Sequence, residues 1–195
     1  MAEVQAGRIP PAAVAALQPI ATWSNSFLVA EHPDLGRDGP VCPFSKASMG
    51  HGLFLLAHLD GVTSNEAIAA AIYRYGDWYR DLSRSVDPAR RKYLTFLVVL
   101  PDVDATDAGE FDELQRDLKD HFVEDGLMIG QFHPVCERSG LWNANFRPLR
   151  SPIPLLAIRS MVREDLPFLV DTPAHFDAYT ARFGATPPPG AADVA

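Results

Sequence analysis

The stretch RKYLTFLVVLPD, residues 91–102, decides the fold because it reads as a buried β-strand. It is short and rich in aromatic and β-branched residues, and it ends at Pro101, where a strand ladder would lose a hydrogen-bond donor. A buried strand belongs inside a sheet that carries a helical layer over at least one face. The neighbouring sequence should therefore supply helices.

Two amphipathic helices are predicted on either side of this strand. Residues 64–84 place apolar side chains at spacings of three and four, and the Ser-Asn pair at their start can cap the helix. Residues 107–126 show the same spacing, and Gly126 can end that helix. Asp112 and Arg116 are spaced to pair on its outer face.

The remaining chain alternates in the same way, and the expected fold is α/β (α+β). We expect one domain over residues 1–184, built on a central sheet of about four to five strands flanked by helices, and a disordered Pro-rich tail over 185–195. The further elements are short strands at 53–59, 127–132 and 153–161, a helical turn after Pro43, and helices within 8–18 and 173–184.

Composition excludes some classes of function. The chain has 195 residues and a net charge of −8, which argues against binding nucleic acid through its phosphates. The N-terminus has no basic segment before an apolar core, and no apolar run is long enough to span a bilayer. We expect a cytoplasmic protein without membrane contact, in which thiols stay reduced. A homodimer is expected only because symmetric dimers are common.

The motifs for dinucleotide, phosphate, serine-hydrolase and thioredoxin chemistry are absent, which leaves a cysteine-histidine set. GQFHPVCERSG carries His133 and Cys136, and GPVCPFSK carries Cys42. A structural zinc site needs four ligands, so these three would need His51 or His58 as the fourth. A thiolate or an imidazole could instead hold heme iron. Both cysteines could also be simple packing residues.

An arginine-rich loop follows this set. ERSGLWNANFRPLRSP contains Arg138, Arg147 and Arg150, an unusual density in an acidic protein. Guanidinium groups bind carboxylates in a two-pronged manner, so the loop could clamp a heme propionate or a substrate carboxylate. The alternative is a solvated loop with its own ion pairs.

Four segments in order resemble the YqcI/YcgG group of heme proteins. They are EHPDLGRDGPVCPFSKASMGHG, IGQFHPVCERSG, LWNANFRPLR and IRSMVRED, and together they extend over roughly residues 30–168. Cys42 stands at the position of that group's cysteine, although here a proline follows the cysteine rather than preceding it. The chain also resembles uncharacterised proteins that carry a GPVCPF signature.

The resemblance implies heme b and a heme-dependent oxygenase, one that N-hydroxylates an amino or guanidino group of a small amino-acid-like substrate in biosynthesis. It implies that His133 or Cys42 holds the iron, with the order of the motifs favouring His133, and that Arg138, Arg147 or Arg150 binds propionates or a substrate carboxylate. An acidic protein suits a cationic substrate. The electron donor and the catalytic residues stay unassigned. The alternative is a non-catalytic heme- or small-ligand-binding protein that carries or senses.

Overall fold

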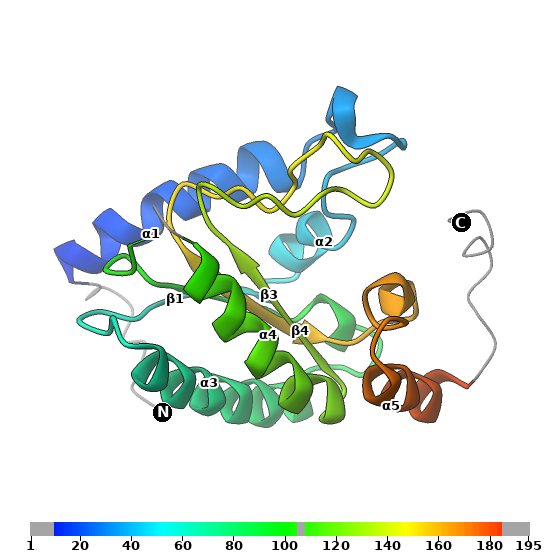
Figure 1. Cartoon of the computed structure of the whole chain (residues 1–195). Coiled ribbons are helices and arrows are strands. Elements are labelled where there is room, and N and C mark those ends of the chain that lie inside the picture. The colour runs from blue at the N-terminus through cyan, green and yellow to red at the C-terminus, as the bar shows by residue number, and fades with distance from the viewer. Residues whose placement is uncertain (1–9, 105–107, 185–195) are drawn as a thin grey trace.

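The computed structural model describes residues 10–104 and 108–184 as one α+β domain around a mixed four-stranded sheet, as the sequence predicted (Figure 1). The sheet order is β1-β2-β4-β3, with β1 parallel to β2 and β4 antiparallel to both of its neighbours. The strands are β1 (Phe54–His58), β2 (Thr95–Val99), β3 (Leu127–Phe132) and β4 (Leu155–Ser160). The expected tail at 185–195 lies outside the described residues.

The helices fall within or close to the segments predicted for them. α1 extends past the expected 8–18 to Trp23, and a π-helical turn (Ser24–Leu28) continues it. The helices are α1 (Pro11–Trp23), α2 (Ser45–Gly50), α3 (Asn65–Ser85), α4 (Gly109–Glu124) and α5 (Pro173–Phe183). Short 3-10 turns occupy Pro33–Leu35, Arg91–Tyr93 and Arg163–Phe168.

Local chemistry sets the ends of the two central helices. The Ser64 hydroxyl accepts the Ala67 N–H at 3.3 Å and caps α3. Gly126 follows α4 with a φ of 72°, a left-handed conformation that a glycine adopts without steric cost. A β-carbon at this position would also lie 2.5 Å from the Arg182 guanidinium, which would have to shift.

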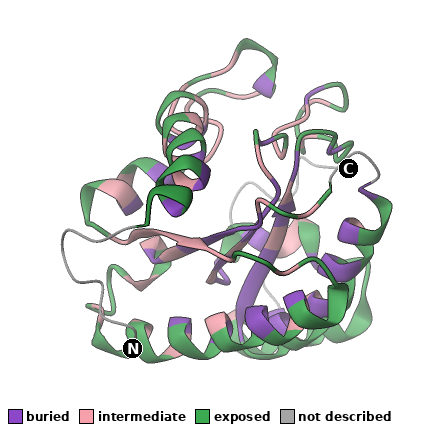
Figure 2. Ribbon diagram, turned by 90° about the vertical axis from the view of Figure 1, so that its left-hand side faces the viewer, coloured by how far each residue is buried: buried purple, intermediate pink, exposed green. Residues whose placement is uncertain are grey.

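The helices form layers on both faces of the sheet. α3 and α4 cover one face, and α1 crosses the other (Figure 1). The main core lies between the sheet and the α3–α4 layer, where Leu156 and Ile158 of β4 are fully buried. Burial is concentrated along the inner strands and on the helix sides that face them (Figure 2). None of the described helices is both long and apolar enough to cross a membrane.

Candidate functional site

One face of the interior strand β4 is incompletely covered. On the α1 side, Leu155 is 0% exposed under Ile20, but the next two residues on that side, Ala157 and Arg159, are half-exposed. On the opposite face Leu156 is 0% exposed. An interior strand normally buries both faces when helices lie on both sides. Helix α1 therefore covers one end of this face, the α5 cluster covers Met128 beside Arg159, and Ala157 and Arg159 stay half-exposed between them.

The uncovered area consists of four residues from three strands, which we call the open face: Thr95, Gly130, Ala157 and Arg159. Register makes them neighbours, because Gly130 pairs with Ala157 and Arg159 pairs with Thr95. All four are half-exposed. A β-carbon built on Gly130 would meet only the Phe132 ring, at 3.8 Å, so open space lies above it. Gly130 and Ala157 thus place two small residues side by side on this face.

Arg159 provides the charge of the open face, and Asp165 fixes its position. The two guanidinium nitrogens of Arg159 lie 2.7 and 2.5 Å from the Asp165 carboxylate, whose side chain is 3% exposed. Asp165 also accepts the Val162 N–H at 2.8 Å. Burial lowers the pKa of Arg159, but the hydrogen bonds and charge of Asp165 outweigh it and raise that pKa above its ordinary value. The guanidinium therefore stays charged.

Cys42 is a half-exposed free thiol between the π-helical turn and α2, and its N–H donates to the Leu28 carbonyl at 2.8 Å. After Asp165, Cys42 is the next group whose presence helps to raise the pKa of Arg159. The residue that the resemblance singled out is therefore accessible to a ligand.

His133 lies in a different environment. Its ring is 1% exposed, and its Nε2 lies 3.2 Å from Asp112 Oδ1, an oxygen that also accepts the Gln131 amide N–H at 3.0 Å. A carboxylate accepts, so Nε2 carries the hydrogen. Nδ1 is buried and has no hydrogen-bond partner within the described residues. Neither nitrogen is open to a large planar group in this arrangement.

Sequence reasoning missed the role of Asp112. Helical spacing directed it toward Arg116 on the outer face, but it contacts His133 and Gln131 at the end of β3 instead. Spacing within one helix cannot reveal a partner on a neighbouring strand. The available signal was the pair of polar residues Gln131 and His133 at the end of the apolar run LMIGQF, because buried polar side chains require partners.

The two proposed iron ligands sit in different settings. His133 follows Phe132, which pairs with Leu155 at one end of β4. Cys42 lies on the segment between the π-helical turn and α2.

Cys136 is a packing residue. Its side chain is 0% exposed, and burial raises the pKa of its thiol, so it stays protonated near neutral pH. Residues 10–104 and 108–184 contain no group of three or more His, Cys, Asp or Glu side chains placed to hold a metal ion. The four-ligand zinc arrangement is therefore not assembled within these ranges.

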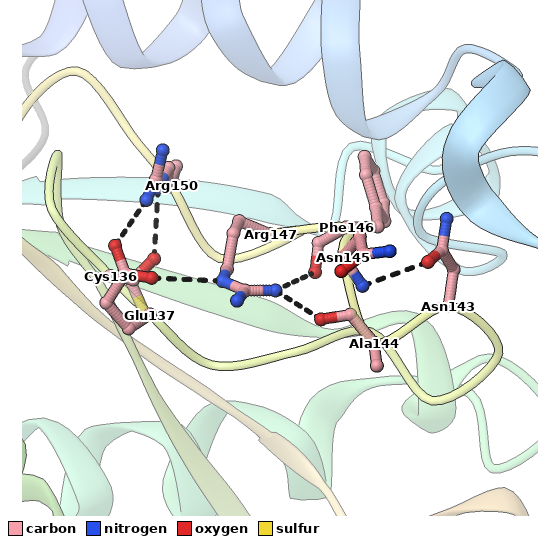
Figure 3. A network of polar contacts seen from close by, with 8 residues as sticks. All are labelled: Cys136, Glu137, Asn143, Ala144, Asn145, Phe146, Arg147 and Arg150. Carbon is pink, nitrogen blue, oxygen red and sulfur yellow. Dashed lines mark hydrogen bonds and ion pairs between the residues drawn. The ribbon is translucent and has the colours of Figure 1, made fainter.

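The loop arginines bind the protein's own carboxylate (Figure 3). Arg147 Nε lies 3.2 Å from Glu137, and Arg150 pairs with the other oxygen of the same carboxylate. Arg150 also donates to the Cys136 carbonyl at 3.1 Å. Hydrogen bonds from Arg147 and then Arg150 lower the pKa of Glu137. These contacts match the alternative of a loop with internal ion pairs, in which Glu137 occupies the predicted anion clamp.

Arg138 is not part of this cluster. It is exposed and lies near Lys119 on α4. Burial is the main cause that lowers the pKa of Lys119, and the charge of Arg138 lowers it further. The Lys119 ammonium donates to the Phe168 carbonyl at 2.8 Å, which ties α4 to the turn before α5. Of the three arginines, the structure thus brings Arg147 and Arg150 together and separates Arg138.

A depression of about 670 Å³ lies between α1 and residues 150–152. Trp23, Pro134 and Arg150 contribute to its walls. It is shallow and wide open, and the guanidinium of Arg150 is engaged by Glu137 as that of Arg159 is by Asp165.

Comparison with known proteins identifies a family without assigning an activity. No curated protein and no solved structure matches the sequence. A family model does match, over residues 17–193, and these residues include every element of the open face and both cysteines. The chain therefore belongs to the family described as a domain of unknown function, DUF6875.

Proposed function

We propose that the open face is a ligand-binding site and that its ligand is heme b, held through the Cys42 sulfur. Two observations support this most: Cys42 is a half-exposed free thiol, and the α1 side of the interior strand β4 is half-exposed at Ala157 and Arg159. An interior strand left uncovered exposes apolar surface to water, which costs stability. An apolar group bound on the open face would bury that surface.

Cys42 fits the axial position better than His133 does. The sulfur of a half-exposed cysteine can reach a ligand, whereas His133 is buried with Nε2 committed to Asp112. Gly130 and Ala157 present a small, apolar floor on which a flat ring could lie. The sequence resemblance to heme proteins places a cysteine at this same position. These features favour thiolate ligation over imidazole ligation.

The activity we propose is that of a heme-dependent oxygenase that N-hydroxylates an amino or guanidino group of a small amino-acid-like substrate. Thiolate-bound heme supplies oxygen activation, because the sulfur donates electron density that favours O–O cleavage. The chain's own contribution would be to hold the iron through Cys42 and to orient a carboxylate with Arg159. Asp165 would keep the guanidinium in place. The net charge of −8 favours a cationic substrate.

Non-catalytic binding is the second candidate. Cys42 and the four residues of the open face include no His, Asp or Glu that could act as a general base. A carrier or sensor would need only the binding surface. A reduced thiol suits a reducing compartment, so we propose the cytoplasm for either function.

The absorption spectrum of the protein produced with a heme precursor tests the proposal. A stoichiometric Soret band is expected, and Cys42→Ala should abolish it. Cys136→Ala is the matched control, because it removes the other thiol away from the open face, and it should retain the band. A colourless wild-type protein overturns heme binding. Loss of the band in His133→Ala with retention in Cys42→Ala would move the iron to His133. Oxygen-dependent turnover of amino-acid substrates then separates oxygenase from carrier.

A further inference from the structure

The depression between α1 and residues 150–152 is walled by rigid rings and one charge. Pro19, Trp23, Pro134 and Pro152 contribute the rings, and Arg150 contributes a guanidinium. All five residues are exposed or half-exposed. Small-molecule sites are mostly apolar, with a few polar groups that fix the orientation of the ligand. The depression has this composition, and it shares no residue with the open face.

Helix α1 departs from regular helical structure twice along this wall. Pro19 stands inside the helix, where proline removes a backbone hydrogen bond, and it is exposed, so its ring adds little to the core. The π-helical turn follows α1 directly, and its residue Ser26 also lines the depression. Turns of this type occur frequently at functional sites. Local costs without an evident gain in packing concentrate at such sites.

The Trp23 ring is held in place before any ligand arrives. It stacks on Phe27 with the ring centroids 5.9 Å apart, and it meets the edge of Phe132 at 5.7 Å. It is nevertheless half-exposed. A ring that is already fixed loses little conformational freedom when a flat molecule covers it. The uncovered part of Trp23 therefore offers a preformed aromatic surface.

Arg150 is oriented by a contact that does not involve Glu137. Its Nε donates to the carbonyl of the fully buried Cys136 at 3.1 Å (Figure 3). Its Nη2 pairs with Glu137, whose side chain is 72% exposed, and such exposed ion pairs contribute little because water screens them. Within residues 10–104 and 108–184, Nη1 has no hydrogen-bond partner. An external anion could therefore replace Glu137 while the guanidinium keeps its orientation.

We infer that this depression binds a small aromatic carboxylate, with the ring against Trp23 and the carboxylate on Arg150 in place of Glu137. Charge selects the anion, because Arg150 is the only charged side chain among the described residues that line the depression. A guanidinium binds a carboxylate through two parallel hydrogen bonds, here from Nη1 and from the Nη2 released by Glu137. The ring-lined walls select a flat apolar body. The inference does not depend on heme, since the two sites have no residue in common.

Titration of the full chain with cinnamate tests the inference, followed by NMR of the indole N–H groups. The chain has three tryptophans, and Trp23→Phe identifies the signal of Trp23. That signal should shift saturably, with a dissociation constant of about 1 mM or lower for a ligand of this size. Trp78, which is exposed on α3, is the matched control and should not shift. Cinnamamide, the neutral counterpart, should bind roughly tenfold more weakly.

Three variants assign the carboxylate contact. Arg150→Gln should weaken cinnamate binding by roughly tenfold and leave cinnamamide binding unchanged. Arg147→Gln is the matched control, because Arg147 also contacts Glu137 but does not line the depression, and it should keep the preference for cinnamate. Glu137→Gln should tighten cinnamate binding by roughly twofold to fivefold, since it removes the competing carboxylate. Circular dichroism confirms that each variant is folded.

Three results would overturn the inference. The first is a Trp23 signal that does not shift saturably with cinnamate. The second is equal affinity for cinnamate and cinnamamide, or an unchanged affinity for cinnamate in Arg150→Gln, because the guanidinium would then not select the ligand. The third is weaker cinnamate binding in Glu137→Gln, because Glu137 would then orient Arg150 rather than occupy the ligand's position.

Discussion

The Arg159 guanidinium and the Asp165 carboxylate meet in a two-pronged ion pair, with N–O distances of 2.7 and 2.5 Å, at the margin of the open face. Asp165 is almost fully buried, whereas the Arg159 side chain is 26% exposed. The carboxylate thus holds a charged side chain in place while part of that side chain remains accessible. Any ligand on the open face would meet a guanidinium of fixed position whose charge Asp165 balances.

Replacement of Asp165 should destabilise the protein. Asp165→Asn leaves the Arg159 charge uncompensated, and we expect a loss of about 2 kcal/mol, below the value for fully buried pairs because solvent screens Arg159. Urea unfolding measures the change. Glu164→Gln is the control, because it removes a neighbouring exposed carboxylate and should change the free energy of unfolding by less than about 0.5 kcal/mol. Equal effects in the two variants would contradict a structural role for the pair.

The two cysteines should differ in reactivity. Cys42 is half-exposed, whereas Cys136 is fully buried and burial raises the pKa of its thiol. A thiol reagent added to the native, ligand-free protein should therefore modify one cysteine rapidly and the second only after unfolding. Cys42→Ala should abolish the rapid phase, and Cys136→Ala should preserve it. Rapid modification of both thiols would show that Cys136 is not packed as described.

Asp112 should stabilise the fold through His133. Asp112→Ala removes the acceptor of a buried imidazole N–H, and an unsatisfied buried donor costs about 1–3 kcal/mol. Asp117→Ala, at an exposed position on the same helix, provides the comparison and should have little effect. Thermal or urea unfolding of both variants measures the difference. A loss no larger than that of the control would mean that the Asp112–His133 contact contributes nothing to stability.

Ionisation of Tyr79 at alkaline pH should lower the stability of the fold. Burial raises the pKa of its phenol above 10.0, and the hydroxyl donates to the Leu94 carbonyl at 3.0 Å. A group whose pKa is higher in the folded state contributes stability below its unfolded pKa and loses it as pH rises toward the folded value. Stability should therefore fall above about pH 10. Tyr79→Phe should weaken this decline, measured as the free energy of unfolding against pH, and an unchanged decline would assign it to other groups.

Regular patterns made the secondary structure predictable. The apolar spacing of 64–84 and 107–126 fixed α3 and α4, and local chemistry at Ser64 and Gly126 fixed two of their ends. The strand at 127–132 was predicted with the residues that the structure gives it. These features depend on neighbours in the chain, so the sequence carries them directly.

The open face could not be predicted in the same way. Gly130 and Ala157 are far apart in the chain, and only the β3–β4 register makes them neighbours. Nothing in either strand's pattern shows how much of the sheet α1 covers. The arginine loop was ambiguous for a similar reason, because its chemistry depends on where Glu137 turns its carboxylate. Three arginines in one loop can bind a ligand's carboxylate only when no carboxylate of the protein already occupies them.

The central claim is that the open face holds the ligand, and heme titration of Gly130→Leu tests it most directly. A leucine at this position would fill the space above the sheet, since only the Phe132 ring lies within 4 Å of the added β-carbon. Gly50→Leu is the control, because no atom lies within 4 Å of its β-carbon and it lies outside the open face. The account predicts that Gly130→Leu remains folded and loses heme binding, while Gly50→Leu binds as the wild type does. Undiminished heme binding by a folded Gly130→Leu protein would contradict it.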